Sequence, residues 1–550
     1  MWAILLALVT GFIAQALVGL IGLITNISFY GRWSTQFSSP ANNHLGWLVL
    51  FIPAIGGLVV GVMARYGSKA IRGHGIPEAM EQVLLNESKI PKRITFLKPL
   101  SAAVSIGTGG PFGAEGPIIA TGGALGSLVG QLLHMTPNER KTLLAAGAAA
   151  GMAATFGSPV SAVLLAIELL LFEYRPRSIV PVALASAAAT AVRMLYVGTE
   201  PIFAMPLLER PGGEALAIYV LVGALVGWLS VYVTHAVYWI EDLFEKLPVH
   251  WMWWPALGGL VVGGIGIFAP HTLGVGYDNI EGLVAGRIAG RVVLFLCIMK
   301  FLSWSISLGS GTSGGTLAPL FTIGGATGVA LGELLSHQLP SVGIDPRICA
   351  LVGMAAMFAG ASRALLASVV FAFETTLQPM GLLPLLGGCT AGYLVSSLLM
   401  RNTIMTEKLA RRGVRVPADY AADYLEQVRV GDACSMKVVS LPADSTLGDA
   451  GSLLDGHQGF PVVDTNQHII GVVTRRDFLG KPPSTRVRDL VRRAPSVVFA
   501  DMSLREAADH MVRENVGRLP VVERSNPRKL IGIVTRSDLL TAHATRLRAE

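Results

Sequence analysis

The sequence predicts an all-α polytopic membrane protein followed by a smaller α/β soluble part. Hydrophobic residues make up 52% of the 550 residues and charged residues only 14%, and the mean hydropathy is +0.56. Such a composition excludes an ordinary soluble protein. The polarity changes sharply near Arg401, after which charged and apolar residues are mixed as in a soluble domain. We therefore place the membrane part before this residue and the soluble part after it.

A series of apolar segments accounts for the membrane part. They are Ile4–Ile24, Leu45–Met63, Ile118–Leu133, Val180–Leu195, Ala217–Val237, Trp254–Ala269, Arg291–Leu308, Leu317–Leu334 and Leu382–Leu399. Several are too short or too interrupted by Gly and Pro to cross about 30 Å of hydrocarbon, which predicts re-entrant helices that line a cavity. The net charge of +7 includes a basic cluster from Arg401 to Arg415. This cluster indicates a cytoplasmic boundary better than it indicates nucleic-acid binding.

Glu115 is the most informative single residue. It is the only charged residue between Lys98 and Glu139, in the run Gly109–Pro117. A lone carboxylate inside a membrane costs about 2.5–3.5 kcal/mol to insert and is rarely idle. Pro117 is compatible with the first turn of a helix, so Glu115 is expected just outside a helix N-terminus. There the unpaired N–H groups and the helix dipole attract negative charge, and the carboxylate and a mobile anion would compete for one place.

The membrane part also contains an internal repeat. Lys98–Gly130 aligns with Lys300–Gly332, with identical residues at many positions, including the two lysines that open the segments. Duplicated halves with Gly- and Pro-interrupted segments are typical of transporters whose site lies between the repeats. In the second repeat, Leu317 takes the place of Glu115. Both repeats are therefore predicted to aim a helix at one region, and only one of them carries a gate.

Four short motifs carry a resemblance to a known family. They are Gly73-His-Gly-Ile-Pro77, Gly113-Ala-Glu-Gly-Pro117, Gly315-Thr-Leu-Ala-Pro319 and Asn402-Thr-Ile-Met-Thr-Glu-Lys-Leu-Ala-Arg-Arg-Gly413. Each motif alone is weak, but four in order on two repeats are very specific. Over nearly its whole length the chain resembles the CLC family of chloride channels and chloride/proton exchangers.

The resemblance implies the CLC fold, with two inverted repeats of broken, tilted helices at about 1–200 and 215–412 of a membrane domain spanning 1–412. It implies a homodimer in the lipid bilayer of the cell membrane, with one chloride pathway in each subunit and Glu115 as its gate. Backbone N–H groups can hold chloride without the deep well that a lysine would create. The residues that the resemblance places around the anion are His74, Gly75, Ile76, Gly113, Ala114, Gly116, Thr316, Leu317, Ala318 and Met405.

The chain departs from the family pattern at the anion site. His74 stands where a serine is usual, and a neutral imidazole donates one N–H while a protonated one adds charge. Alternatively, His74 turns away and the backbone N–H of Gly75 or Ile76 binds the anion. Met405 replaces a tyrosine and cannot donate a hydrogen bond, so it either loosens the inner side of the site or only packs. Leu317 replaces a common phenylalanine, and its backbone N–H would still serve.

A second departure concerns proton coupling. In the family's exchangers an acid often follows the glutamate equivalent to Glu168, and here that position is Leu169, which cannot relay a proton. Glu173 could substitute, although we expect it to be solvated at a helix end beside two arginines. Glu168 aligns with Glu374 of the second repeat, and this symmetry favours a structural role such as a buried hydrogen bond over a proton relay.

The soluble part contains a repeat of its own. The run Val472-Val-Thr-Arg-Arg-Asp477 matches Ile533-Val-Thr-Arg-Ser-Asp538, and each follows a Pro-Val-Val strand. A strand, a Thr and then an Asp opening a helix form an N-cap arrangement. The pattern resembles a tandem pair of CBS domains, which we place at 428–482 and 483–550 after a linker at 413–427.

The CBS resemblance implies a possible site for an adenine nucleotide such as ATP, ADP or AMP. Asp477 and Asp538 would contact ribose hydroxyls, and Thr474 and Thr535 would contact phosphate. The alternative is that these residues only cap their helices and that the pair is empty. Nearby arginines could meet phosphates or could simply be solvated.

The leading hypothesis is chloride transport through each protomer, gated by Glu115, channel-like or weakly coupled to protons, and biased by the CBS pair on the cytoplasmic side. The alternative is a chloride/proton antiporter whose proton route avoids Leu169. A divalent-cation transporter is disfavoured because it needs clustered intramembrane carboxylates, and a sensor with a mere membrane anchor needs no broken repeats. The four cysteines show no metal spacing, and no hydrolase or redox constellation appears. We therefore expect neither a metal site nor an enzyme.

Overall fold

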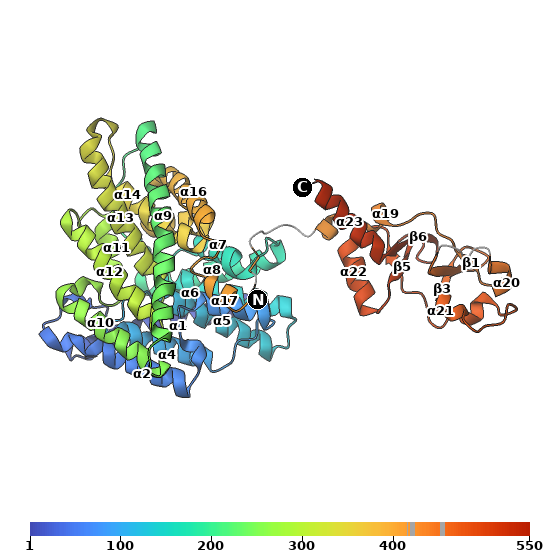
Figure 1. Ribbon diagram of the computed structural model, residues 1–550, viewed down its shortest axis with the longest axis horizontal. Helices are drawn as coiled ribbons and strands as arrows, with labels where there is room; N and C mark the ends of the chain where they lie inside the picture. Colours follow the sequence, from blue (N-terminus) through green and yellow to red (C-terminus); the bar gives the residue numbers. More distant parts are fainter. Residues whose placement is uncertain (415, 418–423, 452–456, 550) are drawn as a thin grey trace. The chain divides into compact units, whose positions relative to one another are not determined.

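A computed structural model describes residues 1–414, 416–417, 424–451 and 457–549. The chain divides near residue 420 into two compact units, a helical one and one that contains small β-sheets (Figure 1). Among the described residues, 8 helices are long and apolar enough to cross a membrane. The predicted class, a polytopic helical membrane part followed by an α/β part, is confirmed.

The first repeat of the helical unit begins with a long helix and continues through shorter ones. Its helices are α1 (Trp2–Tyr30), α2 (Ile52–Tyr66), α3 (Ile76–Leu85), α4 (Ile94–Gly107), α5 (Glu115–Leu132), α6 (Pro137–Phe156), α7 (Pro159–Ala166) and α8 (Pro176–Val197). A π-helical turn, Ile167–Leu171, directly continues α7.

The second repeat has the same sequence of long and short helices. It comprises α9 (Gly213–Glu245), α10 (Trp254–Phe268), α11 (Tyr277–Val284), α12 (Arg291–Gly309), α13 (Leu317–Gln338), α14 (Pro346–Ser362), α15 (Leu365–Thr376) and α16 (Leu382–Leu399), followed by the short α17 (Glu407–Arg411). All nine apolar segments predicted from the sequence lie mainly within these helices.

Local signals explain where the buried helices begin and how closely they pack. Thr136 caps α6 by accepting from the N–H of Glu139, whose carboxylate accepts from Thr136 in return, which satisfies two otherwise unpaired donors. Helix α5 packs on α6, and a Cβ at Gly122 would lie 2.1 Å from the carbonyl oxygen of Gly147. Glycine is therefore required there because the two backbones touch.

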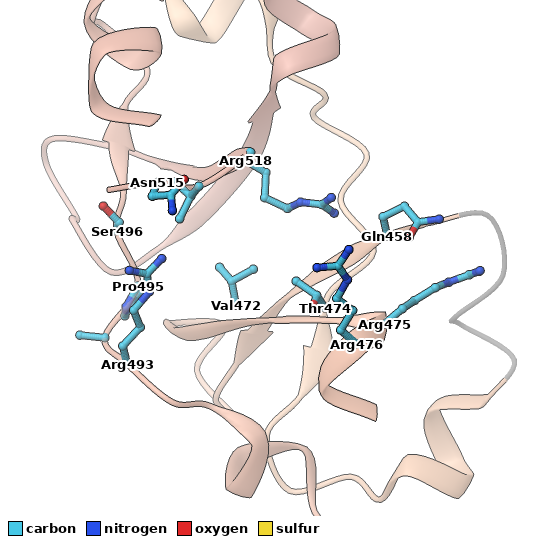
Figure 2. A pocket seen from close by; sticks show the side chains of 13 residues that line it. Gln458, Val472, Thr474, Arg475, Arg476, Arg493, Pro495, Ser496, Asn515 and Arg518 are labelled. Atoms are coloured by element: carbon cyan, nitrogen blue, oxygen red, sulfur yellow. The ribbon is translucent and has the colours of Figure 1, made fainter. Parts of the chain in front are cut away.

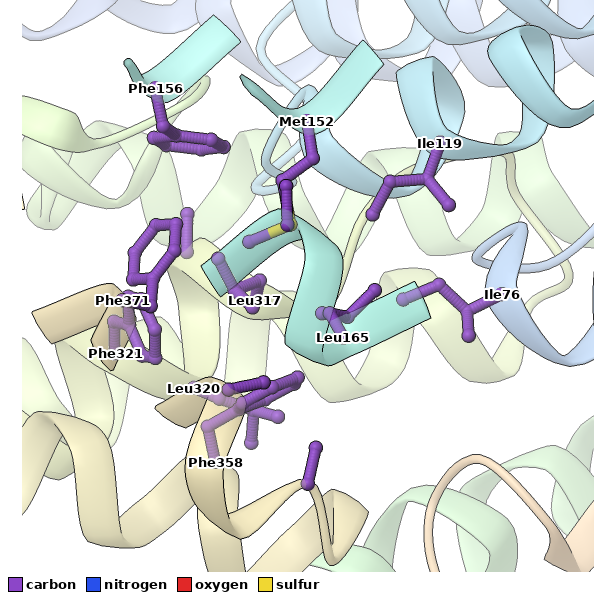
Figure 3. Close-up of a cluster of buried hydrophobic side chains, with 14 of the residues drawn as sticks. Ile76, Ile119, Met152, Phe156, Leu165, Leu317, Leu320, Phe321, Phe358 and Phe371 are labelled. Atoms are coloured by element: carbon purple, nitrogen blue, oxygen red, sulfur yellow. The ribbon is translucent and has the colours of Figure 1, made fainter. Parts of the chain in front are cut away.

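The core joins the two repeats through aromatic rings (Figure 3). Phe156 of α6 meets Phe371 of α15 with ring centroids 5.0 Å apart, and Phe371 meets Phe321 of α13 at 5.1 Å. Phe321 in turn meets Phe358 of α14 at 5.9 Å. All four side chains are at most 2% exposed. This cluster fixes the ends of α6 and α13 beside the site described below.

The second unit contains two sheets of the same design. The first consists of β1 (Leu441–Pro442), β2 (Gly459–Val463) and β3 (Ile469–Thr474), and the second of β4 (Val498–Phe499), β5 (Arg518–Val522) and β6 (Leu530–Thr535). In each, the first pair is parallel, the second is antiparallel, and the register shifts at the last valine of the middle strand. The helices of this unit are α18 (Tyr424–Gln427), α19 (Val430–Ala433), α20 (Leu447–Ala450), α21 (Arg475–Phe478), α22 (Leu504–Arg513) and α23 (Arg536–Ala549).

Candidate anion pathway and regulatory cleft

The three Gly-rich loops of the membrane unit meet at one point. The N–H of Gly315 donates to the carbonyl of Gly113 at 3.0 Å, and the N–H of Gly73 donates to the carbonyl of Thr312 at 3.2 Å. A Cβ at Gly116 would lie 2.1 Å from the carbonyl oxygen of His74. Side chains are excluded from these positions, so the N-terminal ends of α3, α5 and α13 converge as the sequence predicts.

Glu115 lies at this convergence and is 1% exposed. It is the first residue of α5, after the cap residue Ala114, rather than just outside the helix as expected. Its Oε1 accepts a hydrogen bond from the phenol of Tyr277 at 3.1 Å. Its Oε2 is buried and has no hydrogen-bond partner within the described part of the chain. A buried carboxylate oxygen without a partner is costly and marks a place that another species can claim.

Two facing glycines form the seat of Oε2. A Cβ at Gly113 would lie 1.7 Å from Oε2, and one at Gly315 would lie 2.8 Å from it. The carboxylate therefore fills the gap between the N-terminal ends of α5 and α13. Anions are stabilised at such ends by unpaired N–H groups and by the helix dipole.

The first motif differs in one respect from the sequence prediction. The N–H of Gly75 already donates to the carboxylate of Glu78 at 2.7 Å, so in this arrangement Gly75 has no N–H left for an anion. His74 is 6% exposed, and its Nδ1 has no partner among the described residues. Ile76 is the first residue of α3, where backbone N–H groups lack partners inside the helix. The imidazole and the N–H of Ile76 are therefore the donors that this arm can offer.

The second repeat contributes Thr316, Leu317 and Ala318, which open α13 and are at most 2% exposed. Met405 is fully buried and belongs to the same hydrophobic core as Ile76 and Leu317.

A buried lysine braces each repeat. The ammonium of Lys98 donates to the carbonyls of Ile71 and Gly73, both at 2.8 Å. The ammonium of Lys300 donates to the carbonyl of Thr272 at 3.0 Å and to that of Gly274 at 3.3 Å. The aligned lysines thus hold the loops that precede α3 and α11 in the same way.

The positions considered for a proton relay, Leu169, Glu168 and Glu173, have defined surroundings in the structure. Leu169 lies in the π-helical turn and is 4% exposed. The carboxylate of Glu168 accepts from the N–H groups of Leu366 and Ala367, both at 3.0 Å, at the start of α15. Glu173, expected to be solvated at a helix end, is partly exposed; it accepts from the hydroxyl of Ser178 at 2.6 Å and pairs with a lysine of α6.

The other half of this arrangement belongs to Glu374 at the end of α15. Its carboxylate accepts from the N–H groups of Val160 and Ser161 at 2.9 and 2.8 Å, at the start of α7. Each glutamate thus caps the equivalent helix of the other repeat. The two equivalent helices therefore run antiparallel, as inverted repeats require.

A cavity of about 740 Å³ lies beside the end of α7. Its lining includes Glu168, Leu169, Arg363, Asn402 and Thr403. The basic cluster from Arg401 to Arg415 begins at this cavity, and part of it is ion-paired. Lys408 of α17 donates to Glu78 of α3 at 3.2 Å.

The second unit contains a cleft of about 490 Å³ (Figure 2). Its lining comes from both CBS-like halves and is rich in cationic and polar groups: Gln458, Thr474, Arg475, Arg476, Arg493, Ser496, Asn515 and Arg518. These side chains offer many donors to a phosphate and, within the described lining, no carboxylate that would repel one.

The aspartates predicted to contact ribose act as helix caps in the structure. The carboxylate of Asp477 accepts from the N–H and the hydroxyl of Thr474 at 2.9 and 2.7 Å, and Asp538 does the same with Thr535 at 2.7 and 2.8 Å. Partial burial acts to raise the pKa of Asp477, but the Thr474 hydrogen bonds and the charge of Arg492 together hold that pKa below its ordinary value. Thr474 lines the cleft, whereas Asp477 is not among its described lining residues.

Fold and site together define a multi-pass membrane transport protein with duplicated halves and a C-terminal CBS pair. The chain belongs to the family described as voltage gated chloride channel, whose profile matches residues 56–397. CBS domains match residues 430–483 and 487–545.

Several curated relatives agree with this assignment. A putative chloride channel protein ClcB-like from Ralstonia nicotianae is 27% identical, over 66% of this chain and 86% of the relative. Chloride channel protein CLC-f from Arabidopsis thaliana is 28% identical, over 88% and 72%, and the H⁺/Cl⁻ exchange transporter ClcA from Vibrio campbellii is 28% identical, over 72% and 88%.

Solved structures support the fold. A slow cyanobacterial Cl⁻/H⁺ antiporter matches with a TM-score of 0.68 at 24% identity, covering 74% of this chain and 96% of that chain. A eukaryotic CLC transporter matches with a TM-score of 0.61 at 22% identity, covering 98% and 97%.

Proposed function

We propose that the protein moves chloride across a membrane through one pathway in each protomer of a homodimer, and that Glu115 gates this pathway. The observation that carries the proposal is the unpartnered Oε2 of Glu115, seated between Gly113 and Gly315 where two helix N-termini meet. An ionised carboxylate in this seat blocks an anion by occupying its place. Protonation or displacement of the side chain frees the N–H groups for chloride.

The surrounding residues favour passage without tight trapping. The anion would be held by backbone N–H groups of α13 and α5, with the imidazole of His74 and the N–H of Ile76 on the third arm. Neutral dipoles replace part of the hydration shell while leaving the anion able to depart. The ammonium groups of Lys98 and Lys300 donate to backbone carbonyls of the loops that precede α3 and α11.

We propose further that transport is channel-like or weakly coupled to protons. Leu169 offers no titratable group, and both oxygens of Glu168 are engaged by backbone N–H groups. A chloride/proton antiporter is the second candidate, because Glu168 also lines the cavity beside α7 and relatives carry both kinds of name.

The decisive experiment imposes a chloride gradient on vesicles that contain the purified protein and records chloride and external pH together. We expect chloride flux with little proton movement, and loss of its pH dependence in Glu115→Gln. Glu281→Gln is the matched control, since its carboxylate pairs with Arg287 at the surface. If the pH dependence of flux is unchanged in Glu115→Gln, the proposal that Glu115 is the gate is refuted. Proton movement at a fixed ratio to chloride, abolished in this variant, would establish the antiporter instead.

We also propose that the membrane domain spans 1–412, that a linker at 413–427 leads to CBS domains at 428–482 and 483–550, and that these lie in the cytoplasm. The arginine-lined cleft supports binding of an adenine nucleotide through its phosphates. Equilibrium dialysis of the purified full chain with ATP, ADP and AMP tests this, and the absence of saturable binding for all three would refute it.

A further inference from the structure

The internal repeat predicts that four helix N-termini, two from each repeat, converge near Glu115. The sequence motifs mark only three of them, those of α3, α5 and α13. In the first repeat, a lysine-braced loop leads through Gly75, with φ of 94°, into α3. In the second repeat, the loop braced by Lys300 leads through Gly276, with φ of 75°, into α11. Helix α11 is therefore the counterpart of α3, and its first residue, Tyr277, stands where α3 has Ile76.

Tyr277 contacts the gate directly. Its phenol oxygen lies 3.1 Å from Oε1 of Glu115. Its ring packs edge-on against Phe156 at 5.6 Å and against Phe203 at 6.1 Å, which fixes the direction of the hydroxyl. Tyr277 as a whole residue is partly exposed, whereas Glu115 is almost fully buried.

The segment that carries Tyr277 also forms hydrogen bonds with the loop that precedes Glu115 and with the loop that contains Ser39. The N–H of Gly274 donates to the carbonyl of Gly109 at 3.0 Å, at the start of the run that contains Glu115. The next residue, Asp278, accepts from the hydroxyl of Ser39 at 3.0 Å. Tyr277 therefore stands on a backbone whose position relative to Glu115 is set by hydrogen bonds.

The chemistry of the contact depends on the charge of the gate. An ionised carboxylate only accepts hydrogen bonds, so the phenol must donate to it, and such charge-assisted bonds are stronger than neutral ones. The other charged groups that face Glu115 are Lys300 of α12 and, beyond it, Asp278 of α11. Lys300 is held by two carbonyls, which leaves Tyr277 as the one side chain of the described residues that hydrogen-bonds to the gate.

We propose that Tyr277 is a positioning residue that holds the ionised carboxylate of Glu115 in the anion seat, so that chloride must displace the gate from a phenol. This inference rests on the proposed gating role of Glu115. The first repeat presents a helix start to the anion, and the second uses the equivalent helix start to hold the side chain that competes with the anion.

The test compares Tyr277→Phe with the native protein in chloride-loaded vesicles, over a range of pH and chloride concentrations. Loss of one charge-assisted hydrogen bond changes an equilibrium by about tenfold. We therefore expect the chloride concentration for half-maximal flux to fall about tenfold. Because the lost bond favours the ionised gate, protonation becomes easier, and the acid activation of flux should move to higher pH by about one unit.

Two controls separate this role from a structural one. Tyr219→Phe removes another buried phenol, which accepts from the N–H of Asp345 at 3.0 Å far along the chain, and it should leave both profiles unchanged. In a Glu115→Gln background, Tyr277→Phe should have no effect on either profile, because there is no ionised gate to hold.

The outcomes distinguish the inference from the function on which it rests. A shift in the native background that vanishes with Glu115→Gln supports the role of Tyr277. Native-like profiles for Tyr277→Phe, while Glu115→Gln loses its pH dependence, would overturn the inference and leave the gate intact. The same shift in both backgrounds would make Tyr277 merely structural. Unchanged behaviour of Glu115→Gln would overturn both proposals.

Discussion

The reciprocal caps between α7 and α15 lead to a quantitative prediction. Glu168 accepts two backbone N–H groups at the start of α15, and Glu374 accepts two at the start of α7, all at 2.8–3.0 Å. If these carboxylates are structural, replacing either with Ala should destabilise the membrane unit by a similar amount. If Glu168 is a proton relay, its replacement should instead alter proton movement.

The magnitude follows from the environment of the four bonds. In each cap, one N–H donor is exposed and the other is partly buried. A hydrogen bond to a charged group contributes about 1.5–3 kcal/mol, and an exposed one lies at or below the lower end. We therefore expect Glu168→Ala and Glu374→Ala each to cost about 2–3 kcal/mol, somewhat above an ordinary helix N-cap, which is worth about 0.5–2 kcal/mol. The Gln variants keep one acceptor oxygen and should lose about half as much.

The assay is thermal unfolding of the purified protein in detergent, followed by tryptophan fluorescence, together with chloride and proton flux at a temperature where all variants are folded. Glu281→Ala is the matched control, because its carboxylate forms an ion pair with Arg287 at the surface. Two outcomes would refute the reasoning: a native melting temperature for Glu168→Ala, or altered proton movement in Glu168→Gln without loss of stability.

Three further predictions concern the anion seat and the cleft. Gly113→Ala should lower chloride flux more than tenfold, because its Cβ would lie 1.7 Å from Oε2 of Glu115. Gly123→Ala is the control, because its Cβ would lie 3.5 Å from the nearest atom and should leave the flux unchanged. Equal flux in both variants would contradict the anion seat between Gly113 and Gly315. His74→Ser should reduce the acid activation of flux without abolishing it, since a hydroxyl does not gain charge while the carboxyl group of Glu115 is still present, and an unchanged pH profile would make the imidazole a bystander. Arg518→Ala should weaken ATP binding to the full chain about tenfold through loss of a charge-assisted hydrogen bond. Arg412→Ala, which removes an ion pair with α3 outside the cleft, is its control, and equal affinities would place the nucleotide elsewhere.

Hydropathy located the long helices but missed those buried on all sides. The segments from Ile4 to Leu399 that stand out as apolar all fall on helices. Helix α6 did not stand out, although every residue from Leu143 to Phe156 is buried. It consists largely of Ala and Gly, whose hydropathy is mild. These small residues let backbones touch, as small residues do between membrane helices, so such a helix carries a packing signal rather than a hydropathy signal.

The site shows a similar limit. Motif and charge arguments found Glu115, and the structure places it where the Gly-rich loops meet. Tyr277 was not predicted, because it precedes the repeat that opens at Lys300 and its segment is shifted by one residue relative to that repeat. The available signal was Gly73-His-Gly75 against Gly274-Val-Gly276, each before a helix start. Nor could the sequence show that Glu78 takes the N–H of Gly75, since a side-chain contact of this kind depends on the turn.

The two repeats agree where they support the backbone and differ where an ion would pass. The lysine braces and the glutamate caps make the same hydrogen bonds in both repeats, because unpaired backbone groups are equally costly in either half. The differences are Glu115 against Leu317, and Tyr277 against Ile76. A further difference is an extra residue between Glu168 and the left-handed Phe172, compared with Glu374 and Leu377. The π-helical turn absorbs this residue, and such turns often mark functional sites. A duplicated scaffold needs both copies of each brace but only one gate, so the positions at which the copies diverge are those where transport chemistry should be sought.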